Sequence, residues 1–237
     1  MARIIGLSRN LKMAWLNKSV QLLSENLSEK EYKDSLNTYL SFEIKSPTNL
    51  RKTREILMNL WYYENPKTNM LRLKFQALLG EKPDNALIAH WCVLLATYPI
   101  FADVAKVIGR FSDFEDEFTL KQLKEKIFDE WGERATLFHS IDKMISTMKD
   151  FGVLCADKPG HYSIVRYEIS DDKVNALLAA TGICIKDKEK YTLQQLRSMS
   201  YMFPFSYHIK REMLMTNDLF KITNVGGKMM VGLADKL

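Results

Sequence analysis

One stretch of the sequence decides the fold. Residues 99–166 read PIFADVAKVIGRFSDFEDEFTLKQLKEKIFDEWGERATLFHSIDKMISTMKDFGVLCADKPGHYSIVR. Apolar residues recur in it at intervals of three and four, the spacing that places them on one face of an α-helix. This spacing predicts helices over 100–111, 120–131 and 134–151, with a two-residue strand at 118–119 before the second of them.

A hairpin completes the pattern. Residues 157–160, Asp-Lys-Pro-Gly, are typical of a turn, and segments 153–156 and 161–166 on either side of it are predicted strands. Helix, short strand, helix, tight turn, helix and hairpin is the element order of a winged helix-turn-helix. Residues 99–166 resemble that superfamily, and the resemblance rests on element order because the stretch contains no diagnostic short motif.

The resemblance implies where DNA would bind. In this superfamily the third helix commonly lies in the major groove and the hairpin contacts the backbone. The matching positions, on the third helix and around the hairpin, are Arg134, Thr136, His139, Ser140, Lys143, Lys158, His161 and Arg166. Residues 83–166 carry ten basic and thirteen acidic residues, with Asp142 and Asp150 on the third helix itself. A protein-docking role for the winged helix therefore remains open as the alternative.

The residues before this stretch are expected to form a basic, all-helical domain, 1–82. Ser28-Glu29-Lys30-Glu31 is a capping box, and Ser46-Pro47 places proline at a first helical position. Gly80 suits the C-terminal cap of a helix over 68–79. No alternation of apolar and polar residues typical of a strand interrupts these helices.

Positive charge is concentrated in this N-terminal block, which holds fourteen basic and eight acidic residues. An excess of positive charge attracts phosphate backbones regardless of base sequence. Arg51, Lys52 and Arg54 crowd the start of one helix and can point away from its apolar stripe, so they are candidate phosphate contacts. The alternative is a solvated helical face with pairing to Glu55.

Two further segments complete the predicted organisation. A helix over 85–97, apolar on nearly all sides, belongs to the core and forms a second domain, 83–166, with the winged helix. The third domain, 167–237, is expected to contain helices over 172–182, 192–196 and 206–215 and a hairpin around residues 224–227. This order fits a degraded second winged helix, with Lys210 and Arg211 as its DNA contacts, or equally a helical subdomain with a packing hairpin.

Composition and motifs narrow the class of protein. The chain has 237 residues, 46% apolar and 27% charged, as in globular proteins. No apolar run suits a membrane span, residues 1–6 do not resemble a signal peptide, and three scattered cysteines indicate reduced thiols, so we expect a cytoplasmic protein. The sequence has no Walker-type or dinucleotide loop and no zinc-ligand spacing. We therefore expect no catalysis, no metal and no cofactor.

Three single residues have a structural interpretation. His90 lies in the apolar helix over 85–97, and we expect a hydrogen-bonded core histidine there. Cys92 and Cys155 lie in an apolar helix and a strand, where cysteine usually behaves as a small hydrophobe. The acidic loop 113–117, which could repel DNA locally, is interpreted as a solvated connection.

The layout as a whole has a second resemblance. Residues 46–61 form a helix containing Ser and Arg, 86–108 a central helical stretch, and 141–154 a helix that steps through Phe151-Gly152-Val153 into a strand. This arrangement is similar to the BrxA-like accessory proteins of bacterial phage-exclusion (BREX) systems. The resemblance implies a mainly helical, non-catalytic component of a prokaryotic defence system that binds double-stranded DNA and other proteins of that system. The alternative is an adaptor or transcription regulator that uses the winged helix for docking.

Overall fold

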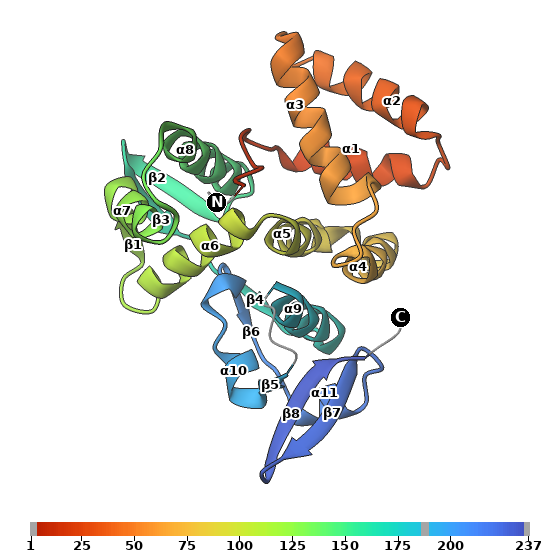
Figure 1. Ribbon diagram of the computed structural model, residues 1–237, viewed down its shortest axis with the longest axis vertical. Helices are drawn as coiled ribbons and strands as arrows, with labels where there is room; N and C mark the ends of the chain where they lie inside the picture. Colours follow the sequence, from red (N-terminus) through yellow and green to blue (C-terminus); the bar gives the residue numbers. More distant parts are fainter. Residues whose placement is uncertain (1–3, 186–189, 235–237) are drawn as a thin grey trace.

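The computed structural model describes residues 4–185 and 190–234, and the described chain is mainly α-helical, as the sequence predicts (Figure 1). Between residues 4 and 82 it contains helices and no strand. These elements are α1 (Met13–Leu23), α2 (Glu29–Ser41), α3 (Pro47–Leu57), a π-helical turn η1 (Met58–Tyr62) and α4 (Asn69–Glu81). A 3-10 turn, η2 (Pro83–Asn85), leads to the next helix.

The predicted start signals of α2 and α3 are present as hydrogen bonds. The Ser28 hydroxyl accepts from the backbone N–H of Glu31, and the Glu31 carboxylate accepts from the backbone N–H of Ser28. The Ser46 hydroxyl accepts from the backbone N–H of Asn49, and Pro47 is the first helical residue. These contacts satisfy donors that have no partner within the first turn of a helix.

A buried helix lies at the centre of the molecule. Every residue from Ile88 to Ala96 is buried in α5 (Ala86–Thr97). The Trp91 ring lies 5.0 Å from that of Phe101 and 5.8 Å from that of Phe203. One hydrophobic core therefore runs through all three segments that the sequence distinguishes.

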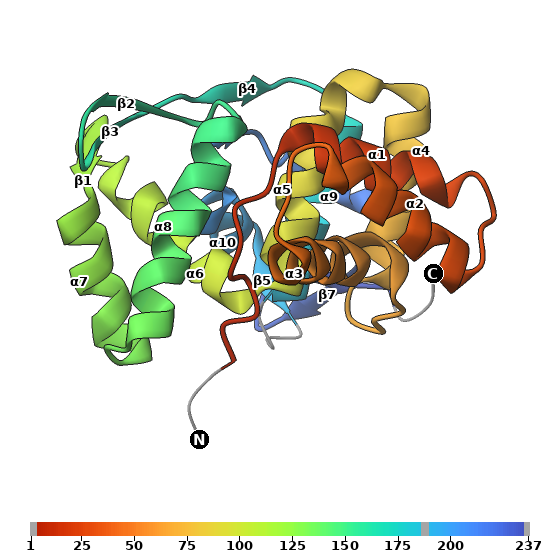
Figure 2. The same cartoon turned by 90° about the horizontal axis from the view of Figure 1, so that it is seen from above.

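Residues 99–164, which we call the first unit, contain the predicted order of elements. They form α6 (Pro99–Phe111), β1 (Glu117–Thr119), α7 (Leu120–Trp131), α8 (Ala135–Asp150), β2 (Leu154–Lys158) and β3 (His161–Ile164). The strands make an antiparallel sheet in the order β1-β3-β2, with Phe118 opposite Tyr162 and Leu154 opposite Ile164. Figure 2 shows α7, α8 and this sheet on the side of the molecule away from α1 to α4.

The hairpin of the first unit differs from the prediction at both ends. β2 continues to Lys158, so the turn consists of Pro159 and Gly160. Gly160 has a φ of 77°, which glycine adopts without the steric penalty of a Cβ atom. β3 ends at Ile164, because the chain then leaves this sheet to form a separate strand, β4 (Tyr167–Ile169).

The described part of residues 172–233, which we call the second unit, has a similar order. Its elements are α9 (Asp172–Ile185), β5 (Tyr191–Thr192), α10 (Leu193–Arg197), a 3-10 turn η3 (Ser200–Met202), β6 (Phe205–Tyr207), α11 (Arg211–Met215), β7 (Phe220–Val225) and β8 (Lys228–Leu233). β5, β8 and β7 form an antiparallel sheet in that order. As in the first unit, the last strand lies in the middle and the strand before the second helix lies at an edge.

The sequence predicts a helix over 206–215, and this prediction is wrong for the first half of the segment. Residues 205–207 form β6, which pairs in parallel with β4, with Tyr167 opposite Phe205. Phe205 is buried, and the Tyr207 hydroxyl donates to the backbone oxygen of Leu196 at 2.9 Å. These tertiary contacts hold the segment extended and override its helical pattern.

Two glycines that the sequence assigns to helix ends lie inside helices instead. Gly80 in α4 does not adopt a positive φ, and a Cβ atom there would meet no atom within 4 Å. Gly182 in α9 admits a neighbouring segment, because a Cβ there would lie 2.2 Å from the sulfur of Met199. Gly109 in α6 does the same, since its Cβ would lie 1.9 Å from the backbone oxygen of Ser200. Gly109 and Gly182 therefore allow η3 and the residue before it to pack closely against α6 and α9.

The two units also share a local sequence at the start of their second helix. Residues 118–123 read FTLKQL and residues 191–196 read YTLQQL. Thr119 caps α7 and Thr192 caps α10, each in a capping box with a glutamine three residues later. The same strand-to-helix connection is therefore built twice.

Candidate nucleic-acid interface

The outward face of α8 carries three of the predicted DNA-binding residues. Thr136, His139 and Lys143 are exposed, and their spacing of three and four residues places them on one face of the helix. α8 packs other residues, including Leu137 and Ile141, into the core. A hydroxyl, an imidazole and an ammonium group therefore project together from one helix, and such groups can donate hydrogen bonds to base edges or phosphates.

Ser140 is not part of this face, which corrects the sequence prediction. Its exposed fraction is 3%, and it lies seven residues before Thr147, on the same face of α8. The Thr147 hydroxyl accepts from the backbone N–H of Leu11 at 2.9 Å, and the Asp150 carboxylate accepts from the backbone N–H of Met13 at 2.9 Å. The N-terminal segment therefore packs on α8, and Figure 2 shows this segment running beside that helix.

Thr147 and Asp150 are positioning residues that the sequence does not identify. Met13 is the first residue of α1, whose own N-cap, Lys12, makes no side-chain cap hydrogen bond. The Asp150 carboxylate supplies an acceptor, and its negative charge suits the positive end of the helix dipole. No local signal could reveal these contacts, because each joins residues more than 130 positions apart.

The hairpin contributes one exposed cation. Lys158 ends β2 and is exposed beside the turn, opposite the half-buried His161. A long ammonium side chain at the tip of a hairpin can contact a phosphate without fixed geometry. The predicted contacts Lys158 and His161 thus lie together at the end of the sheet.

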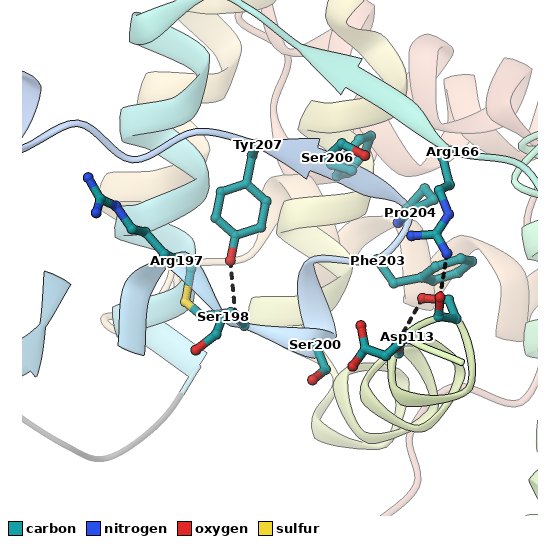
Figure 3. Close-up of a pocket in the computed structure, with 13 residues that line it drawn as sticks. Asp113, Arg166, Arg197, Ser198, Ser200, Phe203, Pro204, Ser206 and Tyr207 are labelled. Carbon is teal, nitrogen blue, oxygen red and sulfur yellow. Dashed lines mark hydrogen bonds between the residues drawn. The ribbon is translucent and has the colours of Figure 1, made fainter. Parts of the chain in front are cut away.

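Arg166 lies away from the hairpin tip, which corrects its assignment to the wing. Because β3 ends at Ile164, Arg166 falls in the connection to β4 and borders a pocket between the two units (Figure 3). Its guanidinium donates to the backbone oxygen of Ser112 and lies 3.3 Å from the Asp116 carboxylate. The side chain therefore fixes the acidic loop and does not join the exposed cation at the hairpin tip.

Asp142, one of the two acidic residues on α8, has a compensating partner. The Asp142 carboxylate forms an ion pair of 2.6 Å with the Lys124 ammonium from α7, which also lies 3.2 Å from the centre of the Phe138 ring. Lys124 is buried, so this pair ties α7 to α8. Arg134, which precedes α8, is half-buried. The negative charge of Asp142 is thus locally balanced and does not oppose an anion on the outward face.

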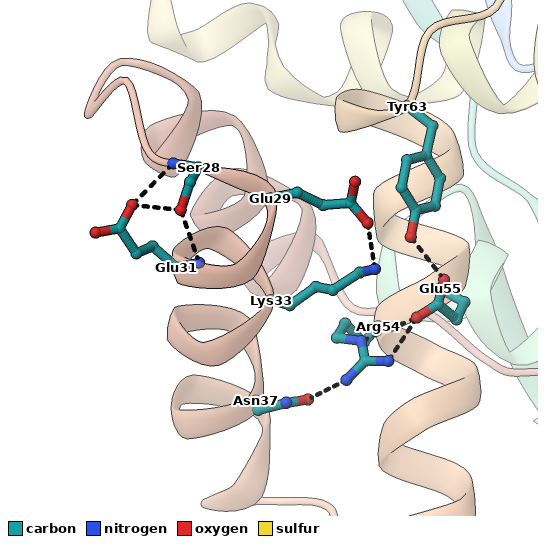
Figure 4. A network of polar contacts seen from close by, with 8 residues as sticks. All are labelled: Ser28, Glu29, Glu31, Lys33, Asn37, Arg54, Glu55 and Tyr63. Carbon is teal, nitrogen blue, oxygen red and sulfur yellow. Dashed lines mark hydrogen bonds and ion pairs between the residues drawn. The ribbon is translucent and has the colours of Figure 1, made fainter.

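The basic face of the N-terminal helices is smaller than predicted. Arg51 and Lys52 are exposed in α3. Arg54 is half-buried and donates to the Glu55 carboxylate at 2.5 Å and to the Asn37 side-chain oxygen at 3.2 Å (Figure 4). Arg54 is therefore held within the fold, whereas the sequence predicts that it projects freely from the basic face.

Glu55 completes the network around Arg54. The Tyr63 hydroxyl donates to its second carboxylate oxygen at 3.0 Å. Burial acts to raise the pKa of Glu55, but the hydrogen bonds from Arg54 and Tyr63 outweigh it and lower the pKa. The pairing of this face with Glu55, which the sequence left as the alternative, is present for Arg54.

The two cations predicted in the C-terminal part differ in their surroundings. Lys210 forms an ion pair with Asp172, at 2.9 Å and 3.0 Å from its two carboxylate oxygens. Arg211, the first residue of α11, is exposed and borders a groove beside β7 and β8. Lys210 therefore ties α11 to α9, and Arg211 faces solvent.

The expectation for His90 is confirmed. Its Nε2 lies 2.8 Å from the side-chain oxygen of Asn17, and its ring meets Trp61 edge to face. Burial lowers the pKa of His90 to about 3. Cys92 is buried, and burial raises the pKa of its thiol to about 12. Cys155 is exposed on β2, so its assignment as a small core hydrophobe is wrong.

The described residues contain neither a metal centre nor a single helix suited to a membrane. Among residues 4–185 and 190–234, no three His, Cys, Asp or Glu side chains lie close enough together to hold a metal ion. No single helix in that part of the chain has the length and apolar character to cross a membrane. The segments Pro83–Thr97 and Pro99–Phe111 reach that length and apolar character only when taken together, and a bend of 116° separates them. Comparisons with family models, curated proteins and solved structures found no match for the chain.

Proposed function

We propose that the protein binds double-stranded DNA without catalysis and that the first unit is a winged helix-turn-helix. The observation that carries this proposal is the order of α6, β1, α7, α8, β2 and β3 with the antiparallel strand order β1-β3-β2. In winged helices of this order the third helix lies in the major groove and the hairpin follows the backbone. α8 has the exposed polar face that this placement requires.

The chemistry of the exposed residues indicates backbone contact with limited base readout. Thr136, His139 and Lys143 face the groove in this arrangement, and Lys158 faces a phosphate at the hairpin tip. Only one of the α8 residues is a fixed cation, and none is the bidentate Arg, Asn or Gln that reads single bases most strongly. Binding should therefore depend steeply on salt and weakly on sequence.

Arg51 and Lys52 provide a second phosphate contact in the proposal. They are exposed at the start of α3, which belongs to the most basic third of the chain. Arg51→Ala combined with Lys52→Ala should weaken DNA binding and leave unfolding by urea unchanged. Arg54→Ala should lower the resistance to urea and leave DNA binding unchanged, because the Arg54 guanidinium is held by Glu55 and Asn37.

Fluorescence anisotropy with a labelled duplex of about 30 base pairs tests the proposal, because that length spans more than one groove repeat. Affinity should fall steeply between about 50 and 200 mM salt, and Lys143→Ala with Lys158→Ala should reduce the slope by about two, one for each lost contact. Lys121→Ala with Lys126→Ala, two exposed lysines on α7, is the matched control. Absence of binding at low salt, or equal effects of the two double variants, would contradict the proposal.

A protein-docking role for the first unit is the second candidate, and one observation favours it. Phe114 is 89% exposed in the acidic loop between α6 and β1. An exposed aromatic ring can pack against a protein partner. The carboxylates around it attract a basic partner and repel DNA. Absence of DNA binding at low salt would favour this candidate. A role in phage exclusion, with other proteins of such a system as partners, remains a proposal that depends on the resemblance of residues 46–61, 86–108 and 141–154.

A further inference from the structure

The second unit covers its hairpin less completely than the first. In the first unit α7 and α8 have 12 and 16 residues, and β2 and β3 have five and four. In the second unit α10 and α11 have five residues each, and β7 and β8 have six each. Figure 1 shows the β7–β8 hairpin extending past α10 at the lower end of the molecule. The helices are therefore too short to cover the whole hairpin.

The uncovered part of the hairpin presents apolar side chains. Ile222 lies opposite Val231 and Asn224 opposite Met229, so these residues share one face of the sheet. Val231 is buried, whereas its partner Ile222 and Met229, two residues nearer the tip, are half-buried. Together with neighbouring helix residues they line a groove of about 440 Å³, which we call the C-terminal groove: Leu193, Arg211, Met215, Ile222, Asn224 and Met229.

Two properties of the C-terminal groove define what fits it. Met215 is 58% exposed, and methionine side chains adapt their shape to an apolar partner. Arg211 lines the groove and Lys228 is exposed at the hairpin tip; residues 190–234 hold six Lys and Arg against two Asp and Glu. The occupant should therefore have an apolar stripe flanked by acidic residues.

The first unit shows the shape of such an occupant. There α8 packs against β2 with a buried stripe that includes Ile141, Met144 and Met148. A helix thus covers the hairpin of the first unit. In the second unit α9, of 14 residues, contacts β8, but the groove beside Ile222 and Met229 is bordered by α10 and α11, which have five residues each. We propose that the C-terminal groove binds an amphipathic α-helix of a partner protein, through apolar residues at helical spacing and acidic residues that face Arg211 and Lys228. This inference goes beyond the proposed DNA binding, which rests on α8, the hairpin of the first unit and the start of α3.

A defined peptide tests the proposal. The probe is a fluorescein-labelled helical peptide of about 18 residues, with leucine at positions i, i+3, i+4 and i+7 and glutamate on the remaining face. It should bind saturably to the full chain and more tightly than the same peptide with lysine in place of glutamate. Met215→Glu should weaken binding about tenfold, the effect of losing one good apolar contact, and Met215→Leu should retain it.

The control and the contradicting outcomes keep this test separate from the DNA experiment. Leu73→Glu changes an equally exposed apolar residue on α4 and should not affect the peptide. Met215→Glu should leave duplex binding unchanged, so that failure of either proposal can be recognised separately. The inference is wrong if the glutamate peptide does not saturate, if the lysine peptide binds as tightly, or if Met215→Glu has no effect. It is also wrong if sedimentation shows a dimer that Met215→Glu converts to a monomer, because a second copy of the chain would then occupy the groove.

Discussion

In the first unit the third helix, α8, presents Thr136, His139 and Lys143 to solvent and covers the hairpin behind it. In the second unit the helix at the same place in the order, α11, is one turn long and presents Arg211 and Met215. Both units have a three-stranded sheet with the same strand order. One topology therefore supports a polar helix face in one case and a groove lined by both apolar and polar residues in the other.

The difference follows from the lengths of the elements and not from their order. A helix of 16 residues has a long exposed face beside its buried stripe, whereas the five-residue α11 buries Met213 and Leu214 and has only three exposed residues. The shared strand-to-helix connection at Thr119 and Thr192 fixes where each second helix begins but not how far it runs. Function must therefore be argued from each surface separately, even within one chain.

Trp91→Ala should have the largest effect and tests whether the two units fold as one. The Trp91 ring contacts Phe101 of the first unit and both Phe203 and Phe205 of the second. Its removal should cost about 4 kcal/mol of unfolding free energy, the usual loss for a buried tryptophan. Urea unfolding followed by circular dichroism should show a single transition shifted to lower urea. Two transitions, of which only one moves, would mean that the units fold independently.

Gly109→Ala should break the contact between the units with a smaller effect. The new Cβ atom would lie 1.9 Å from the backbone oxygen of Ser200, so α6 and η3 must separate. Overpacking of this kind costs about 3 kcal/mol at the upper end of its usual range. Gly80→Ala is the matched control in another helix, where space is open, and should stabilise by roughly 0.5–1 kcal/mol. Equal melting shifts for the two variants would show that the packing of η3 on α6 is loose.

Acid should destabilise the core helix that supports both units. Burial lowers the pKa of His90 from 6.5 to about 3, so the unfolded chain binds the proton first as the pH falls. The contribution of neutral His90 to the unfolding free energy is complete above pH 6.5 and is lost between that value and about pH 3. At pH 5 the loss amounts to about 2 kcal/mol. His90→Gln should remove this part of the pH dependence, measured by urea unfolding at pH 7 and pH 5. An unchanged pH dependence would show that His90 takes up a proton in the folded state.

Local signals predicted most of the helices because their causes are local. The capping boxes at Ser28, Thr119 and Thr192 each satisfy backbone donors within four residues. The apolar stripe of α8 and the uniformly apolar α5 likewise follow from spacing alone. The exposed positions Thr136, His139 and Lys143 follow from the same spacing, since they are the residues left outside the stripe.

The errors arise where distant segments meet. Ser140 reads as polar surface, but its face of α8 packs with the N-terminal segment, through Thr147. Ser206 and Tyr207 read as the start of a helix but lie in β6, which pairs with β4. Arg54 and Arg166 read as free cations, and each is held by groups that lie up to 54 residues away. Spacing along the chain contains no information about such partners, so charge and polarity alone overestimate the exposed polar and cationic surface.

The smallest expected effect compares the two helix starts directly. Thr119→Ala and Thr192→Ala each remove a capping box, at a usual cost of about 1 kcal/mol. We expect Thr119→Ala to cost more, because α7 buries Leu123 and Ile127 and so links its cap to the core, whereas Leu196 is the buried apolar residue of α10. Urea midpoints measure the difference, and Thr→Ser at each position, which keeps the hydroxyl, is the control. A larger loss at Thr192 would mean that the short α10 depends on its cap more than α7 does, and that the second unit forms its helix mainly from this local signal.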